Sequence, residues 1–348
     1  MGGRILERTE GGGYPAAQTG PQRHQVLDRA ANGASGGYPS GISGGYSDYP
    51  TNGSAAVSPE HSGDGRSLLR TPMSRPAAPA NPVDQLIDTL RRDLGGSRVL
   101  AFANPKGGVH KTTACVLTAA TLGSARGKGV LAWDDNELRG TLGLRAGTAR
   151  HARTVRHLIG DLPEVEAAGP KLAERLDEYL RYSADGSFDV LSGDEDPRVA
   201  RKLDPEAVRR ILDILTRTHD IVCVDTGNNV ESPNWLTVLH SADQLVVTTV
   251  PREDAAFSAD WMLDLLHEEG LGKLVQDAIT LISCPTPNRT ELHDDLVAHF
   301  SMRTKQVVVV PYDPALEPGS MIEYSALHPA TRMAWLRAAA SITEKFVQ

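Results

Sequence analysis

The chain has 348 residues, a formal net charge of −8 and three cysteines. This length is enough for one large α/β domain or two small ones. The negative charge argues against nucleic-acid binding through overall charge, and no stretch approaches the roughly 18 consecutive apolar residues of a membrane-spanning helix. The cysteines form no Cys-x-x-Cys pair, which argues against zinc and iron–sulfur centres and fits a reducing, cytoplasmic location.

Residues 1–80 differ in composition from the rest of the chain. They contain 15 of the 33 glycines, seven arginines, no lysine and six acidic residues, so this segment carries +1 and residues 81–348 carry −9. Such a segment cannot bury enough apolar area to offset its chain entropy, and we expect a disordered arm followed by one folded domain, 81–348. The Gly-Gly-Tyr repeats of the arm are interpreted as a linker or as a weakly associating sequence.

From residue 82 onward, apolar runs alternate with segments of helical periodicity. The predicted strands are 99–103, 129–133, 188–191, 220–225, 244–250, 278–283 and 306–310. The predicted helices are 82–94, 114–122, 154–159, 171–182, one that begins at residues 204–206, 258–267 and 331–346. This alternation predicts an α/β fold, a doubly wound and mostly parallel sheet with helices on both faces, which binds its ligand at the carboxyl ends of the strands.

The loop after the first predicted strand has the composition of a phosphate cradle. Glycines let backbone N–H groups close on phosphates, and the following helix N-terminus adds positive potential. Lys111 is expected to reach the outer phosphates, and the Thr112 hydroxyl is expected to bind Mg²⁺. The complete candidate cradle is Lys106, Gly107, Gly108, Val109, His110, Lys111, Thr112 and Thr113.

This Lys-Gly-Gly-x-x-Lys-Thr-Thr pattern resembles the deviant Walker A box of the ParA/MinD family of P-loop ATPases, and the resemblance extends over about residues 97–346. The resemblance implies that ATP and Mg²⁺ are the cofactors and that the active form is an ATP-dependent homodimer. In that dimer Lys106 contacts the nucleotide across the interface, and a partner protein stimulates hydrolysis. Similar Pro-x-Asp segments in the family pack beside the adenine, which implies this place for Pro311 and Asp313.

The loop departs from the P-loop pattern at two glycine positions, which hold Pro105 and His110. His110 either shapes the loop or adds a pH-sensitive donor near the γ-phosphate. After the strand 278–283 the chain has no Asn/Thr-Lys-x-Asp sequence, which argues against guanine specificity.

Acidic residues follow two other predicted strands. Asp225 ends the strand 220–225, in the manner of a Walker B acid that orients Mg²⁺. Asp134, Asp135 and Asn136 stand where the family carries an Asp-x-Asp stretch with one acid near the attacking water. If Asn136 faces the water, hydrolysis is expected to be slow, because an amide cannot accept the water's proton. If Asp135 takes that place, the chemistry is expected to be normal.

We therefore expect a nucleotide-timed ATPase that serves DNA partitioning or the positioning of a cellular machine. Non-specific DNA is a further candidate partner, which would place the protein at the nucleoid. The candidate DNA contacts are Arg198, Arg201, Lys202, Arg209 and Arg210, or Arg145, Arg150, Arg153 and Arg156.

Two other functions fit parts of the sequence. One is a degenerate nucleotide-binding scaffold that works through its arm. The other is a P-loop tyrosine kinase that phosphorylates its own Tyr38, Tyr46 and Tyr49.

Overall fold

The computed structural model describes residues 81–136, 140–147, 153–193 and 203–347, which lie in one compact unit. The predicted arm and its tyrosines lie outside the described residues, as do Arg150, Arg198, Arg201 and Lys202. Within the described part, no helix has the length and apolar character needed to cross a bilayer.

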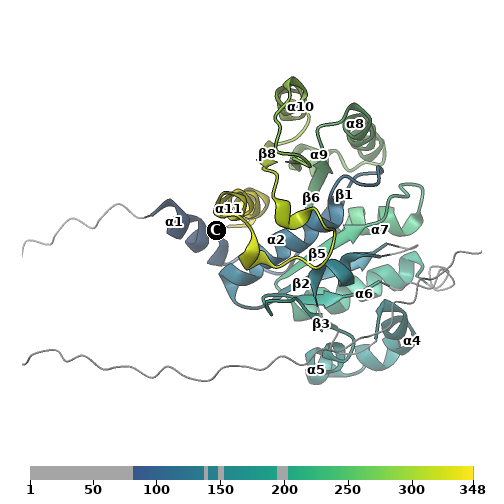
Figure 1. Cartoon of the computed structure of the whole chain (residues 1–348). Helices are drawn as coiled ribbons and strands as arrows, with labels where there is room; N and C mark the ends of the chain where they lie inside the picture. The colour runs from purple at the N-terminus through teal and green to yellow at the C-terminus, as the bar shows by residue number, and fades with distance from the viewer. Residues whose placement is uncertain (1–80, 137–139, 148–152, 194–202, 348) are drawn as a thin grey trace, which may run out of the picture. The chain divides into compact units, whose positions relative to one another are not determined.

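Eight strands form one sheet at the centre of this unit (Figure 1). They are β1 (Arg98–Ala103), β2 (Val130–Asp135), β3 (Arg181–Tyr182), β4 (Asp189–Leu191), β5 (Ile221–Thr226), β6 (Gln244–Thr249), β7 (Ile279–Ser283) and β8 (Gln306–Val310). Their order is β3-β4-β2-β5-β1-β6-β7-β8, and every neighbouring pair is parallel except β3 with β4. The predicted α/β fold with a mostly parallel sheet is confirmed, as are the seven predicted strands.

Helices connect the strands. They are α1 (Pro82–Arg91), α2 (Lys111–Arg126), α3 (Leu142–Ala146), α4 (Val155–Glu166), α5 (Leu172–Asp177), α6 (Pro205–Thr218), α7 (Pro233–Ser241), α8 (Glu253–Glu268), α9 (Gly272–Gln276), α10 (Glu291–Ser301) and α11 (Pro329–Thr343). Helix α6 begins as the sequence predicts, because the Asp204 carboxylate accepts the Ala207 N–H at 2.8 Å and Pro205 occupies the first turn.

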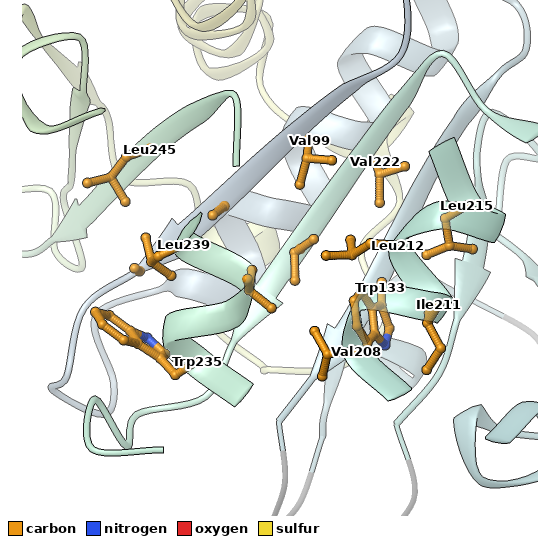
Figure 2. Packing of buried hydrophobic residues seen from close by; sticks show 14 of the residues in the cluster. Val99, Trp133, Val208, Ile211, Leu212, Leu215, Val222, Trp235, Leu239 and Leu245 are labelled. Atoms are coloured by element: carbon orange, nitrogen blue, oxygen red, sulfur yellow. The ribbon is translucent and has the colours of Figure 1, made fainter. Parts of the chain in front are cut away.

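The side chains of each strand alternate between two hydrophobic cores, one on each face of the sheet. On β1, Val99 and Ala101 belong to the core that α4, α6, α7 and α8 cover, whereas Leu100 and Phe102 belong to the core under α1, α2 and α11. Figure 2 shows the first core, in which side chains of α6 and α7 pack over the central strands. Cover on both faces explains why the central strands β1 and β5 carry runs of consecutive apolar residues.

The predicted helix over 171–182 is wrong at its end. Helix α5 stops at Asp177, and Arg181–Tyr182 form β3, which pairs antiparallel with β4. Between them Tyr179 and Leu180 are buried, and the Tyr179 hydroxyl donates to Asp161 Oδ2 at 2.7 Å. Burial of these two residues and strand pairing therefore outweigh the local helical periodicity.

Candidate nucleotide-binding site

The loops that carry the sequence motifs meet at the carboxyl edge of the sheet. Strand β1 lies between β5 and β6, and the chain builds β2 to β5 on one side of it before β6 to β8 on the other. This makes β1 the point at which the strand order reverses, where open α/β sheets bind ligands. The loop after β1 leads directly into α2 at Lys111.

The loop after β1 is fixed at its entrance by Asn104. Its buried side-chain amide donates to the Thr248 carbonyl oxygen at 2.7 Å, and its Oδ1 accepts the Lys106 N–H at 2.9 Å. These bonds attach the start of the loop to β6 and set the direction in which Gly107 and Gly108 leave the sheet. Gly108 then adopts a φ of 75°, which glycine tolerates readily.

His110 has the backbone conformation that glycine usually provides in such a loop. Its φ is 64° and its ψ is 27°, in the left-handed region, immediately before α2. Burial, followed by the nearby Arg145, lowers the pKa of the His110 imidazole, so the ring is neutral at pH 7. The left-handed backbone is what the loop-shaping interpretation of His110 predicts.

Lys111 is buried and donates within the loop. Its ammonium contacts the carbonyl oxygens of Asn104 at 2.9 Å and Lys106 at 3.3 Å, and also Oδ1 of Asn228. Burial lowers the pKa of Lys111 to about 8, although Asp225 acts in the opposite direction. Among the described residues no carboxylate forms an ion pair with this ammonium, and a phosphate would supply that anionic partner.

Asn228 is a site residue that the sequence reasoning missed. It is the second residue after β5, and only its place at the same edge of the sheet as Lys111 reveals the contact.

Thr112 and Asp225 form the candidate magnesium site. The Thr112 hydroxyl donates to Asp225 Oδ2 at 2.6 Å, and Asp225 Oδ1 is buried with no hydrogen-bond partner among the residues that the structure describes. Burial raises the pKa of Asp225 to about 6, while Thr112 and Lys111 lower it. A hydroxyl and a carboxylate with an unused oxygen fit Mg²⁺, which takes few protein ligands together with phosphate and water. No group of three or more His, Cys, Asp or Glu side chains suited to a metal is found in the described part of the chain.

Asp134 organises the loop after β2 from a buried position. It lies beside Asp225 in the sheet register and accepts the N–H groups of Asn136 at 3.2 Å and Leu142 at 3.1 Å. Burial and then the charge of Asp225 raise the pKa of Asp134 to about 7. At Gly140 a Cβ atom would lie 1.9 Å from Asp134 Oδ2. The backbone at residue 140 therefore packs so closely against the Asp134 carboxyl group that only glycine fits there.

Asp135 and Asn136 line a different space, a cavity of about 290 Å³ that we call the β5-side cavity. Its other lining residues are Gly227, Asn228, Asn229, Ser232 and Trp235. The structure therefore brings both candidates for the water-facing position to one cavity beside the phosphate loop, and keeps Asp134 in a structural position.

Pro311 and Asp313 line a cavity of about 340 Å³ on the other side of the loop, which we call the β8-side cavity. His110, Thr113, Arg145, Tyr312 and Trp335 line it as well. The Asp313 carboxylate accepts the N–H groups of Ala315 at 3.0 Å and His328 at 2.9 Å, so it holds the loop in shape. The predicted adenine segment thus borders the phosphate loop.

Lys106 lies at the surface of the site. Its ammonium pairs with Asp254 Oδ2 at 3.1 Å, and its side chain is 41% exposed. The loop therefore holds one lysine inside the cradle, Lys111, and one outside it.

The candidate DNA contacts are corrected by the structure in one case. Arg145 is buried beside the β8-side cavity and so cannot belong to a DNA-binding surface. Three others form ion pairs with acidic residues: Arg153 with Glu178 at 3.2 Å, Arg209 with Glu206 at 3.0 Å, and Arg210 with Glu166 at 2.7 Å.

No family model matches the chain. It is 28% identical over 261 residues to the ESX-1 secretion-associated protein EspI of Mycobacterium tuberculosis, a match that covers 74% of this chain and spans 38% of that relative's length.

Solved structures show the fold directly. The cell-division ATPase MinD of Pyrococcus furiosus superimposes with a TM-score of 0.56 at 19% identity, over 72% of this chain and 99% of MinD. A ParA-family ATPase of Chlorobium tepidum gives 0.54 at 17% identity, over 72% and 96%. The chain therefore has the ParA/MinD-type P-loop NTPase fold.

Proposed function

We propose that the chain is an ATPase of the ParA/MinD type, in which ATP binding, dimer formation and slow, partner-stimulated hydrolysis act as a switch. The observation that carries this proposal is the group formed by Lys111, Thr112 and Asp225. A buried ammonium and a carboxylate with an unused buried oxygen stand together at the N-terminus of α2. In a magnesium-bound nucleotide the phosphates would be the anionic partner of the Lys111 ammonium, and the magnesium ion would be the cationic partner of the Asp225 carboxylate.

In this proposal the two cavities have different functions, one for the attacking water and one for the adenine. Lys111 exchanges the Asn228 amide for a phosphate oxygen. Thr112 and Asp225 would hold Mg²⁺, and the ion would supply positive charge to the phosphates. Asp135 or Asn136 orients the attacking water at the β5-side cavity. Pro311 and its neighbours at the β8-side cavity receive the adenine.

Lys106 supports the dimeric form of the switch. Its side chain is half-exposed and contacts Asp254 at the surface, outside the cradle of its own chain. An exposed ion pair of this kind contributes little stability and exchanges readily. Lys106 is therefore free to leave Asp254 for a nucleotide bound to a second copy.

The experiment that tests nucleotide binding is calorimetric titration of the purified chain with Mg-ATP and Mg-ADP. We expect the wild type to bind both, and Lys111→Ala to lose binding because the phosphates lose their buried cation. Lys273→Ala is the matched control, since that side chain is 90% exposed on α9. A wild-type chain that binds neither nucleotide would reject the ATPase and favour the scaffold that works through its arm.

We further propose that the cargo is a secretion apparatus, with a partner protein of that apparatus setting the timing in the cytoplasm. The support is the match to a relative named as ESX-1 secretion-associated, together with the acidic partners of Arg153, Arg209 and Arg210. An arginine that is already paired with a carboxylate binds a DNA phosphate less strongly, because its charge is partly neutralised.

Titration with non-specific duplex DNA separates this cargo from DNA. We expect no DNA binding in Mg-ATP or in Mg-ADP from a protein that still takes up nucleotide. Binding in Mg-ATP alone, abolished by Lys111→Ala, would instead assign the protein to DNA partitioning at the nucleoid.

A further inference from the structure

Arg145 is a buried cation whose partners in the structure are all neutral. Its side chain extends from α3, and the whole residue is 8% exposed. Nη2 donates to the Thr113 hydroxyl at 2.9 Å and Nη1 to the Ser320 carbonyl oxygen at 3.1 Å. None of the ion pairs of the described residues includes Arg145.

A guanidinium in this position is energetically costly without an anion. Arginine stays protonated in proteins, so burial cannot be relieved by loss of the proton, and two neutral acceptors leave its charge uncompensated. Buried charges are usually paired, and here burial itself lowers the pKa of Arg145. The missing partner is therefore expected to be a bound anion.

The surroundings of Arg145 place that anion beside the phosphate loop. Thr113 lies in the first turn of α2, where backbone N–H groups and the helix dipole attract phosphate. Lys111, on the same turn, points to Asn228 at the β5-side cavity. Arg145 instead lines the β8-side cavity together with Thr113 and Pro311. A nucleotide whose terminal phosphates lie at Lys111 and whose base lies at Pro311 has its α-phosphate between them.

The Arg145 side chain and the helix that carries it are both held in place before any ligand binds, the side chain by its hydrogen bonds to Thr113 and Ser320. The Arg145 carbonyl oxygen accepts the Ile322 N–H at 2.8 Å, which joins α3 to the segment before α11. Next to it, a Cβ atom at Gly143 would lie 2.3 Å from Ser192 Oγ, so α3 packs closely on the segment after β4. Such support reduces the entropy that the side chain loses on binding.

We propose that Arg145 binds the α-phosphate of the nucleotide and thereby serves the diphosphate and triphosphate alike. This inference rests on the proposed nucleotide binding and adds a contact outside the phosphate loop. It also predicts that Arg145 and Lys111 act on different phosphates. Arg145 contributes to affinity for every phosphorylation state with an α-phosphate, whereas Lys111 acts at the terminal phosphates.

The test compares Arg145→Gln and Arg145→Lys with wild type in titrations with Mg-ADP and Mg-ATP. We expect Arg145→Gln to weaken both nucleotides by a similar factor, about 10- to 100-fold, and Arg145→Lys to keep part of the affinity. Arg210→Gln is the control, because that arginine forms an ion pair on the surface with Glu166. Thermal unfolding without nucleotide reports whether each variant folds.

A stereochemical measurement separates direct contact from a structural role. In ADPαS a sulfur atom replaces one of the two non-bridging oxygens of the α-phosphate. A residue that binds one of these two positions distinguishes the two diastereomers. We expect wild type to prefer one diastereomer and Arg145→Gln to lose most of that preference. An equal preference in both proteins, or Mg-ADP affinities within twofold of each other, would overturn the proposal. A wild type that binds no nucleotide would instead contradict the proposed function itself.

Discussion

His110 holds a left-handed backbone at the position where P-loops usually have glycine, with a φ of 64°. It is the single non-glycine residue of the described chain with a positive φ. This conformation costs an ordinary L-residue about 1–2 kcal/mol. The motif identified the position from sequence, but the strain depends on the loop geometry, which Asn104 and the start of α2 impose.

Replacing His110 measures this strain. We expect His110→Gly to raise the free energy of unfolding by about 1 kcal/mol, because glycine adopts positive φ without the Cβ contact. His110→Val should lower it by at least as much, since a β-branched residue tolerates this conformation least. Urea denaturation without nucleotide measures both variants. A His110→Gly variant less stable than wild type would show that the imidazole contributes more than its backbone costs.

The residue scale also shows what sequence reasoning misses. Lys111, Thr112 and Asp225 were predictable, because each is marked by its type and by the apolar strand beside it. Asn228 and Arg145 were not. An asparagine in a turn and an arginine in a short helix are common at surfaces, and only tertiary contacts bring these two to Lys111 and Thr113.

At the scale of the secondary-structure elements, the neighbouring strands β2 and β5 place two buried carboxyl groups side by side. Asp134 and Asp225 are register partners on these strands. Burial raises the pKa of Asp134 to about 7 and that of Asp225 to about 6, from 3.8 in each case. In the unfolded chain both acids release their protons near pH 4, whereas in the folded chain they keep them up to pH 6–7.

This difference gives the nucleotide-free protein a defined pH dependence. The folded state binds more protons than the unfolded state above pH 4, so the stabilising contribution is lost as pH rises through 6 and 7. We expect the free energy of unfolding to fall by about 2–3 kcal/mol from this pair between pH 5.5 and pH 8. Asp134→Asn, which has no proton to lose, should flatten the profile. Identical slopes in wild type and Asp134→Asn would contradict this account.

The elements themselves were predictable to different degrees. The central strands are apolar runs in a sheet covered on both faces, and seven of the eight strands could be located from the sequence. Helix α3 has five residues, too few for a periodic pattern, and so it was missed together with the position of Arg145. The boundary between α5 and β3 was missed because the pairing of β3 with β4 is not a local property.

At the scale of the whole molecule, the fold followed from the alternation of strands and helices, and the likeness to MinD and ParA structures agrees with it. The partners of the surface arginines could not be predicted from the sequence in the same way. Arginines at helical spacing look alike in sequence whether they face DNA or an acidic neighbour, and the structure pairs Arg209 and Arg210 with glutamates. The proposed role in secretion therefore rests on a relative of which the chain spans 38%.

The central claim is that ATP joins two copies of the chain, with Lys106 of each copy reaching the nucleotide of the other. The most direct test is the molar mass by light scattering in Mg-ATP, in a non-hydrolysable Mg-ATP analogue and in Mg-ADP. We expect the mass of wild type to double with the triphosphates and not with Mg-ADP, and Lys106→Ala to remain monomeric while its nucleotide affinity is kept. A wild type that stays monomeric at saturating triphosphate, or a Lys106→Ala variant that dimerises equally well, would contradict the account.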